Sequence, residues 1–196
     1  RGMMKKIIIG ITGASGSIYG KRMVEVLLEN QIFVILIATE NGKKVFSYEL
    51  DLDFDLWSNG LKEKYENFAE EDINNLFAGA ASGSYDFDSV IILPCSMGTL
   101  GKIANGISSN LLMRAADVAL KERRDLILVP REMPLHQIHL ENMFKISRCG
   151  GTIMPAMPGF YHKPQTKEDL VDFVVGKILD YMKIDNNLFG KWGNDR

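Results

Sequence analysis

Cysteine and histidine are scarce in this sequence, which limits the metal and redox chemistry that it can support. Its 196 residues include two cysteines, Cys95 and Cys149, and three histidines. The cysteines lie far apart without a CxxC pattern, which argues against a disulfide framework or a zinc site and is typical of a reducing compartment. His136 and His139 lie three residues apart, but without an HExxH pattern. We therefore expect no bound metal.

Long hydrophobic runs and an excess of positive charge are also absent. The longest apolar runs, residues 7–14 and 90–95, are far shorter than the ~18 residues of a membrane-spanning helix. The 23 basic and 25 acidic residues give a formal charge of −2, so no global positive field attracts a nucleic-acid backbone. We expect no signal peptide, because no apolar core followed by a cleavage site lies near the N-terminus, and Arg1-Gly2 ahead of Met3 resembles the remnant of an expression tag. We expect a cytoplasmic protein with neither a nucleic-acid nor a membrane partner.

What the sequence does contain is the alternation of strands and helices that is typical of an α/β protein. Short runs rich in Ile, Val and Leu predict strands buried on both faces of a parallel sheet. Segments with helical periodicity and one apolar stripe lie between them. The predicted strands are residues 6–11, 32–38, 88–93, 126–129 and 152–154, and the predicted helices are residues 18–30, 99–105, 110–122, 138–147 and 168–182. We predict a single domain over residues 1–196, built as an open, doubly wound parallel sheet with helices on both faces.

Residues 51–76 do not follow this alternation. They are more polar and lack a sustained period, and a stretch of small residues follows them at 77–85. We interpret the segment as a solvated excursion beside the sheet. Glu40, just after the second predicted strand, is expected in the first turn of a helix.

Ligands of open α/β sheets bind outside the carboxyl ends of the strands, so the loops after the strands are the candidate site. The loop after the first strand runs from Gly10 to Ser17. Its glycines permit a tight turn, and the amide groups at the following helix start favour a phosphate. The loop is not a GxGxxG fingerprint, and the alternative is a strand-to-helix turn without a ligand.

Three further loops carry polar or aromatic side chains. Residues 94–99, PCSMGT, are small and hydroxyl-bearing at a helix start, which suits either an anion cradle or helix capping. Arg131 and Glu132 directly follow the strand at 126–129, and burial of either charge would require a partner. Residues 155–164 form a proline-stiffened loop with Phe160 and Tyr161. That loop suits a planar cofactor or an apolar substrate group, unless Phe160 merely pins it to the core.

Four segments together resemble the flavin prenyltransferase family of the UbiX type. They are GITGASGSIYGKR at 10–22, PCSMGTLGKIANGISSNLLMRAADVALKERR at 94–124, LVPREMPLHQIHLENM at 128–143 and PAMPGFYHKPQTKEDLVDFVVGKILD at 155–180. The resemblance implies a flavodoxin-like or Rossmann-like three-layer sandwich that binds FMN. It also implies transfer of a dimethylallyl group from dimethylallyl phosphate to reduced FMN, without a metal. Members resemble one another in forming dodecamers with sites at subunit junctions, and UbiD-type decarboxylases use the prenylated flavin.

The resemblance also implies roles for individual residues. Ser15, Lys121, Arg131 and Glu132 would be catalytic, with Ser15 near the reactive N5 of the flavin and Glu132 transferring a proton as the new ring closes. The FMN-binding positions would be Gly13, Ala14, Ser15, Thr39, Ser96, Met97, Gly98, Thr99 and Arg131. The positions that hold the prenyl donor would be Lys121, Arg131, Tyr161, Lys177, Arg114 and Trp192, with Arg114 in a supporting role at the site or at an interface.

At three places the sequence differs from the family pattern or extends the resemblance. Lys177 stands where the family usually has an arginine, so the charge is kept and the bidentate fork is lost. Leu76-Phe77 stand where some members carry a tryptophan that shields the prenyl group. Trp192 matches a C-terminal tryptophan of close relatives, and we expect the tail at 183–196 to cover the site of a neighbouring subunit.

Other functions remain as alternatives. FMN-dependent cysteine decarboxylases have a similar architecture, but their PxMNxxMW segment and the Asn in the loop equivalent to PCSMGT are missing here. A nicotinamide dehydrogenase would need a YxxxK pair, which this sequence lacks. A non-catalytic flavin carrier would need the loops at Gly13 and Ser96, but not Lys121, Glu132 and Tyr161 together. The motifs fit a phosphate or a pyrophosphate donor and name no particular receiving decarboxylase.

Overall fold

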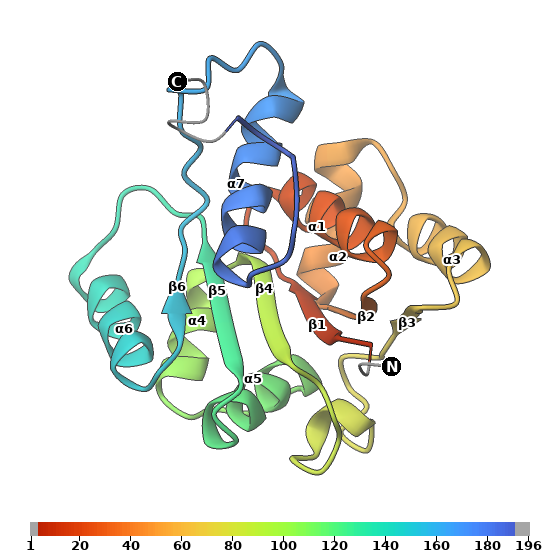
Figure 1. The fold of residues 1–196 in the computed structure, drawn as a ribbon. Coiled ribbons are helices and arrows are strands. Elements are labelled where there is room, and N and C mark those ends of the chain that lie inside the picture. Colours follow the sequence, from red (N-terminus) through yellow and green to blue (C-terminus); the bar gives the residue numbers. More distant parts are fainter. Residues whose placement is uncertain (1–3, 191–196) are drawn as a thin grey trace.

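Six parallel strands with helices on both faces make up the computed structural model, which describes residues 4–190 (Figure 1). The strands are β1 (Lys6–Ile11), β2 (Phe33–Ala38), β3 (Phe68–Glu70), β4 (Ser89–Cys95), β5 (Asp125–Pro130) and β6 (Thr152–Ile153). The helices are α1 (Ser17–Glu29), α2 (Glu40–Leu50), α3 (Phe54–Lys64), α4 (Met97–Ala104), α5 (Leu111–Lys121), α6 (Gln137–Arg148) and α7 (Lys167–Tyr181), with a short 3₁₀ turn at Gly79–Ala81. The predicted fold class is confirmed.

The order of the strands fixes where a ligand can bind. It is β3-β2-β1-β4-β5-β6, so the chain builds one half of the sheet outward from β1 and then returns to build the other half from β4. In such sheets a crevice opens outside the carboxyl ends of the two strands where the direction reverses. Here those strands are β1 and β4, whose register runs from Ile7↔Ser89 to Gly10↔Ile92.

Two apolar layers sandwich the sheet because its strands are buried on both faces. One layer packs Ile7, Ile9 and Ile11 of β1 against α1, α2, α3 and α7. The other packs Ile8 of β1 against α4, α5 and α6. Each strand therefore needs apolar residues at consecutive positions, which explains the continuous Ile, Val and Leu runs. Among residues 4–190, no helix combines the length and apolarity needed to cross a membrane.

The structure confirms the ten predicted strands and helices with small shifts at their ends, and it corrects the interpretation of residues 51–76. That segment contains α3 and the edge strand β3 rather than a solvated excursion. Phe54, Trp57 and Leu61 recur at helical spacing and are buried in the core, and Phe68 is buried beside them. The sequence signal was weak because charged residues and Gly60 interrupt the stripe and because β3 has only three residues. Glu40 does begin a helix, α2, as predicted.

Candidate functional site

The loops after β1 and β4 meet at the reversal point of the sheet. The Thr12 hydroxyl donates to the Pro94 carbonyl at 2.7 Å and accepts the backbone N–H of Ser96 at 2.8 Å. The hydrogen bonds of Thr12 therefore connect the two predicted cofactor-binding segments, because Thr12 directly precedes residues 13–15 and its partner Ser96 begins residues 96–99. The structure brings these two parts of the predicted site together.

Helix α1 begins in a left-handed turn. A carboxylate from another helix accepts the free N–H groups at this helix start. Gly16 has φ 110°, which favours glycine, and no side chain of the preceding loop caps the helix. Instead, Glu49 of α2 accepts the N–H groups of Gly16 at 2.9 Å and Ser17 at 3.0 Å. In this structure a carboxylate of the protein therefore meets the amide groups at the helix start, and the phosphate contact that the sequence predicts there stays a prediction.

Glu49 is held in its charged form. Burial raises the pKa of its carboxyl group, but hydrogen bonds from the Ser15 side chain and from the amides of Gly16 and Ser17 outweigh burial and leave the pKa below its ordinary value. Sequence reasoning missed this residue. Helical spacing could have found it, because Glu49 follows the buried residues Gly42 and Phe46 at i+7 and i+3 on α2.

The other residues predicted to bind FMN also lie at this edge, with different degrees of access. Gly13, Ser15 and Gly98 are exposed, Thr39 and Ser96 are half-buried, and Ala14, Met97 and Thr99 are buried. Thr39 and Ser96 cap α2 and α4 by accepting the N–H groups of Gly42 and Thr99. The capping alternative is thus correct for the Ser96 hydroxyl. Any ligand contact of the buried positions must come mainly from the backbone.

Arg131 and Glu132 lie on the same edge, directly after β5. Both are exposed, and Glu132 Oε1 accepts the N–H of Met133 at 3.0 Å. They line a cavity of about 450 Å³ together with apolar side chains from two loops and α6. Its full lining is Pro130, Arg131, Glu132, Met133, Pro134, Leu135, Met143, Pro155, Ala156 and Met157. A cation and a carboxylate therefore stand at the mouth of an apolar groove.

The aromatic loop after β6 is anchored by different residues than expected. Phe160 is 69% exposed, so it does not pin the loop to the core. Tyr161 packs edge-on against Phe173 of α7 at 5.6 Å between ring centroids, and His162 stacks on the same ring at 5.0 Å. Lys177 is exposed one helical turn beyond Phe173 on α7. Phe77, the candidate shield for a prenyl group, is also exposed and lies in the loop after β3.

Lys121 and Arg114 are not at this edge of the same chain. Lys121 ends α5, just before β5 begins, and contacts the carboxylate of Glu122. Arg131 follows the other end of β5, whose six residues span roughly 20 Å at about 3.3 Å per residue. Arg114 pairs with Asp117 at 2.6 Å and donates to the Ala81 carbonyl at 3.1 Å. Within one chain, Lys121 and Arg131, which are both predicted to hold the prenyl donor, therefore lie at opposite ends of β5.

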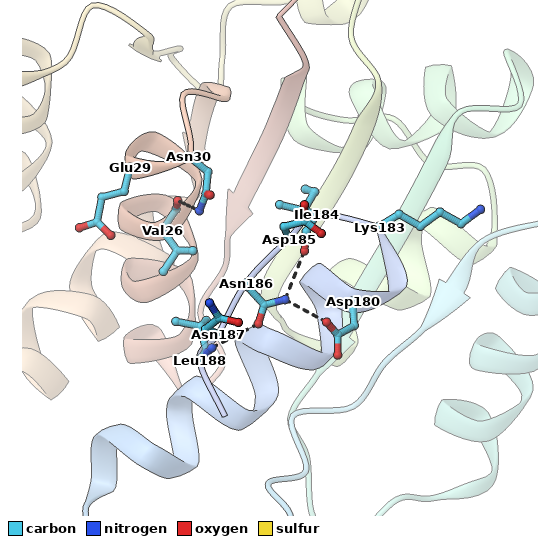
Figure 2. Close-up of a pocket in the computed structure, with 10 residues that line it drawn as sticks. All are labelled: Val26, Glu29, Asn30, Asp180, Lys183, Ile184, Asp185, Asn186, Asn187 and Leu188. Atoms are coloured by element: carbon cyan, nitrogen blue, oxygen red, sulfur yellow. Dashed lines mark hydrogen bonds between the residues drawn. The ribbon is translucent and has the colours of Figure 1, made fainter. Parts of the chain in front are cut away.

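A second cavity lies at the opposite, amino end of the sheet (Figure 2) and contains none of the predicted site residues. It encloses about 870 Å³ between the end of α1 and the segment after α7. Asn186 Nδ2 donates there to Asp180 Oδ1 at 2.9 Å and to the Ile184 carbonyl at 3.2 Å. In the described part of the chain, no three His, Cys, Asp or Glu side chains are grouped so that they could hold a metal ion.

The first part of the predicted C-terminal tail folds onto its own chain. Phe189 packs against Phe173 at 5.0 Å, and a Cβ at Gly176 would lie 2.6 Å from the Phe189 ring. Residues 183–190 therefore rest on α1 and α7 of their own chain. Trp192, with the prediction attached to it, lies outside the described residues.

Comparisons of sequence and structure with known proteins find similar flavoproteins over nearly the whole chain. A family model described as Flavoprotein matches residues 2–179. The flavin prenyltransferase UbiX of Methanocaldococcus jannaschii is 50% identical over 188 residues, covering 96% of this chain and 98% of that protein. A crystal structure of AnUbiX in complex with FMN and dimethylallyl pyrophosphate is 36% identical and superposes with a TM-score of 0.91, covering 97% of this chain and 98% of that one. A dodecameric FMN-dependent UbiX-like decarboxylase from Escherichia coli O157:H7 is also 36% identical, with a TM-score of 0.89 and coverage of 96% and 100%.

Proposed function

Because the chain belongs to the UbiX flavin prenyltransferases within the Flavoprotein family, we propose that it transfers a dimethylallyl group from dimethylallyl phosphate to reduced FMN. The observation that carries the proposal is the 50% identity to a flavin prenyltransferase along 96% of the chain. The meeting of the β1 and β4 loops beside Arg131 and Glu132 supports it. The product would be prenylated FMN, which a UbiD-type decarboxylase would use in the cytoplasm.

The edge of the sheet at β1 and β4 fits a flavin. Gly13 and Ser15 are exposed on one loop, and a Cβ at exposed Gly98 on the other would meet no atom within 4 Å. Backbone and small side chains can therefore approach a planar ring closely. The residues that would hold FMN are Gly13, Ala14, Ser15, Thr39, Ser96, Met97, Gly98, Thr99 and Arg131. When bound, reduced FMN supplies the nucleophilic nitrogen that accepts the prenyl group.

Ser15 and Glu49 would accept the proton that leaves that nitrogen. Glu49 accepts the N–H groups of Gly16 and Ser17, directly after Ser15, and the Ser15 side chain lowers its pKa. The Ser15 hydroxyl would donate to Glu49 and accept a hydrogen bond from the flavin nitrogen. A proton received at Ser15 Oγ can pass to the charged Glu49 carboxylate as the Ser15 hydrogen moves along the same bond. Glu132, at the end of β5, would exchange the proton needed when the additional ring closes.

Positive charge would stabilise the departing phosphate. Negative charge grows on the phosphate oxygens as the C–O bond breaks, and preorganised cations and hydroxyl donors lower the barrier. Arg131, Lys177 and the Tyr161 hydroxyl would supply that stabilisation without a metal. Lys177 offers a point charge rather than the fork of an arginine, so the donor would bind less tightly than in relatives with arginine there.

Lys121 would complete the site from a neighbouring copy of the chain. In one chain it lies at the opposite end of β5 from Arg131, so a second subunit must bring a Lys121 to the phosphate if this residue contacts it. A dodecamer, like that of the related E. coli protein, would place several copies around each site. Arg114, braced by Asp117 and Ala81, would then support the helix that presents Lys121.

The decisive experiment is anaerobic incubation of the purified protein with reduced FMN and dimethylallyl phosphate, with EDTA present and no metal added. We expect mass spectrometry of the released flavin to show one added prenyl unit. A parallel reaction with dimethylallyl pyrophosphate identifies the preferred donor. Unchanged FMN with both donors would contradict the proposal and favour a flavin carrier or a cysteine decarboxylase, which a peptide ending in cysteine would then test.

A further inference from the structure

A single buried hydroxyl connects the two loops that would hold the flavin. Thr12 is 1% exposed, and its Oγ1 both donates to the Pro94 carbonyl and accepts the N–H of Ser96. The Thr12 backbone N–H donates to the same Pro94 carbonyl at 3.3 Å. These hydrogen bonds therefore all join Thr12, directly after β1, to residues at the end of β4.

These contacts continue the pairing of β1 and β4 beyond the sheet. The β1–β4 register ends at Gly10↔Ile92, and the register of β4 with β5 is irregular between Ile92 and Cys95. Pro94 has no N–H to donate, so the regular ladder cannot continue through it. Two residues beyond the last β1 pair, the Thr12 hydroxyl adds two hydrogen bonds to the contact that the Thr12 N–H makes with the Pro94 carbonyl.

The bridge leads directly into the proposed ligand groups on both sides. Thr12 precedes Gly13 in the chain, and its partner Ser96 caps α4 by accepting the Thr99 N–H at 3.2 Å, while the Ser96 and Thr99 hydroxyls lie 3.0 Å apart. A shift of Thr12 would therefore move the 13–15 loop relative to the start of α4. Because Thr12 is buried, it would act through these neighbours rather than by touching a ligand.

We propose that Thr12 is a positioning residue, which sets the spacing of the two FMN-binding loops through its shared hydroxyl. This inference rests on the proposed function, because it takes both loops to hold the flavin. It predicts that FMN affinity depends on a hydroxyl at position 12 more than fold stability does. If the hydroxyl only stabilised the fold, its removal would lower the stability more than the FMN affinity.

The test compares three variants in a flavin fluorescence titration with oxidised FMN, with a thermal melt of each protein. Thr12→Val keeps the shape of the side chain and removes both bonds, so we expect the Kd for FMN to rise about tenfold, the usual effect of unpairing a buried hydrogen-bonding group. Thr12→Ser restores the hydroxyl, and we expect a Kd within about twofold of the wild type. Ser89→Ala is the matched control, since Ser89 is a buried hydroxyl at the other end of β4 whose Oγ has no hydrogen-bond partner. Its Kd should not change.

The proposal is overturned if Thr12→Val binds FMN like the wild type, if Thr12→Ser fails to restore binding, or if Ser89→Ala weakens binding equally. If Thr12→Val does not fold, Thr12→Cys replaces it, because a thiol is a weak donor and acceptor in the same place. Failure of the transferase proposal is seen separately. A wild type that binds FMN but forms no prenylated flavin rejects the activity, while the binding comparison still decides the role of Thr12.

Discussion

Glu49 Oε2 accepts the backbone N–H of Gly16 at 2.9 Å, so α2 supplies the negative charge at the start of α1. The two helices α1 and α2, beside the loop proposed to hold the flavin, are thereby joined through one carboxylate. The amide dipoles at the helix start favour an anion there, and the carboxylate in turn keeps Ser15 and Gly16 in place. This contact has consequences for stability, for acid sensitivity and for the site.

Glu49→Gln should lower the free energy of unfolding by about 1 kcal/mol, because the amide keeps one acceptor oxygen but loses the charge that complements the helix start. The measurement is urea unfolding at pH 7 followed by circular dichroism. Glu29→Gln is the control, since Glu29 is exposed at the opposite end of α1, where a negative charge gains nothing from the helix dipole. An equal loss in both variants would show that the Gly16 contact has no special effect.

The same contact should weaken in acid. The pKa of Glu49 is lowered in the folded protein from an ordinary value of 4.5, so its stabilising contribution is complete above that value and is lost as the pH falls through the lowered pKa. The difference in unfolding free energy between wild type and Glu49→Gln should therefore be constant from pH 8 to about pH 5 and shrink below it. A difference that grows on acidification would contradict this assignment.

Glu132→Gln should retain FMN binding and lose prenyl transfer. The variant keeps the size and the N–H acceptor of the side chain but cannot exchange a proton, so kcat should fall about 100-fold or more. Flavin titration and mass spectrometry of the released flavin measure the two properties. Glu141→Gln, an exposed change on α6, should affect neither. Loss of both properties in Glu132→Gln, or of neither, would be inconsistent with a role in proton transfer.

Lys177→Arg should tighten the binding of the prenyl donor. A guanidinium can bind phosphate oxygens in bidentate fashion, so we expect the KM for dimethylallyl phosphate to fall by about threefold. Lys177→Ala should raise it by about tenfold, and Lys167→Ala, an exposed lysine at the start of the same helix, should leave it unchanged. Steady-state kinetics at saturating reduced FMN would reveal the difference. An unchanged KM in both Lys177 variants would exclude contact with the phosphate.

Lys121 and Glu132 should complement each other between subunits. Lys121→Ala and Glu132→Gln proteins should each be nearly inactive alone, while coexpressed oligomers should recover activity at about a quarter of their sites if subunits mix at random in a closed assembly. Two affinity tags isolate the mixed oligomers for assay. No recovery would mean that both residues act from the same chain or that Lys121 has no part in the site.

Local patterns were sufficient to predict most of the fold. The run at residues 6–11 predicted β1, and the apolar stripe of residues 110–122 predicted α5, because a buried strand or helix face requires a periodicity that neighbouring residues carry themselves. The edge strand β3 escaped notice because three residues, one buried and two half-buried, carry too little of that pattern. The family motifs likewise lie on the loops that the structure places together at the β1 and β4 ends, while the roles that they imply for single residues stay predictions.

The sequence by itself determined the alternation of strands and helices, the small-residue loops after β1 and β4, and the resemblance to a prenyltransferase. Only the tertiary structure decided which groups meet. Thr12 and Ser96 are 84 residues apart in the chain, and Glu49 reaches Gly16 across 33 residues. The tertiary structure also places Lys121 and Arg131 at opposite ends of β5. The physical reason is that periodic burial is a local property of the chain, whereas the order of strands in the sheet, and hence the neighbours of each loop, follows from packing across the whole molecule.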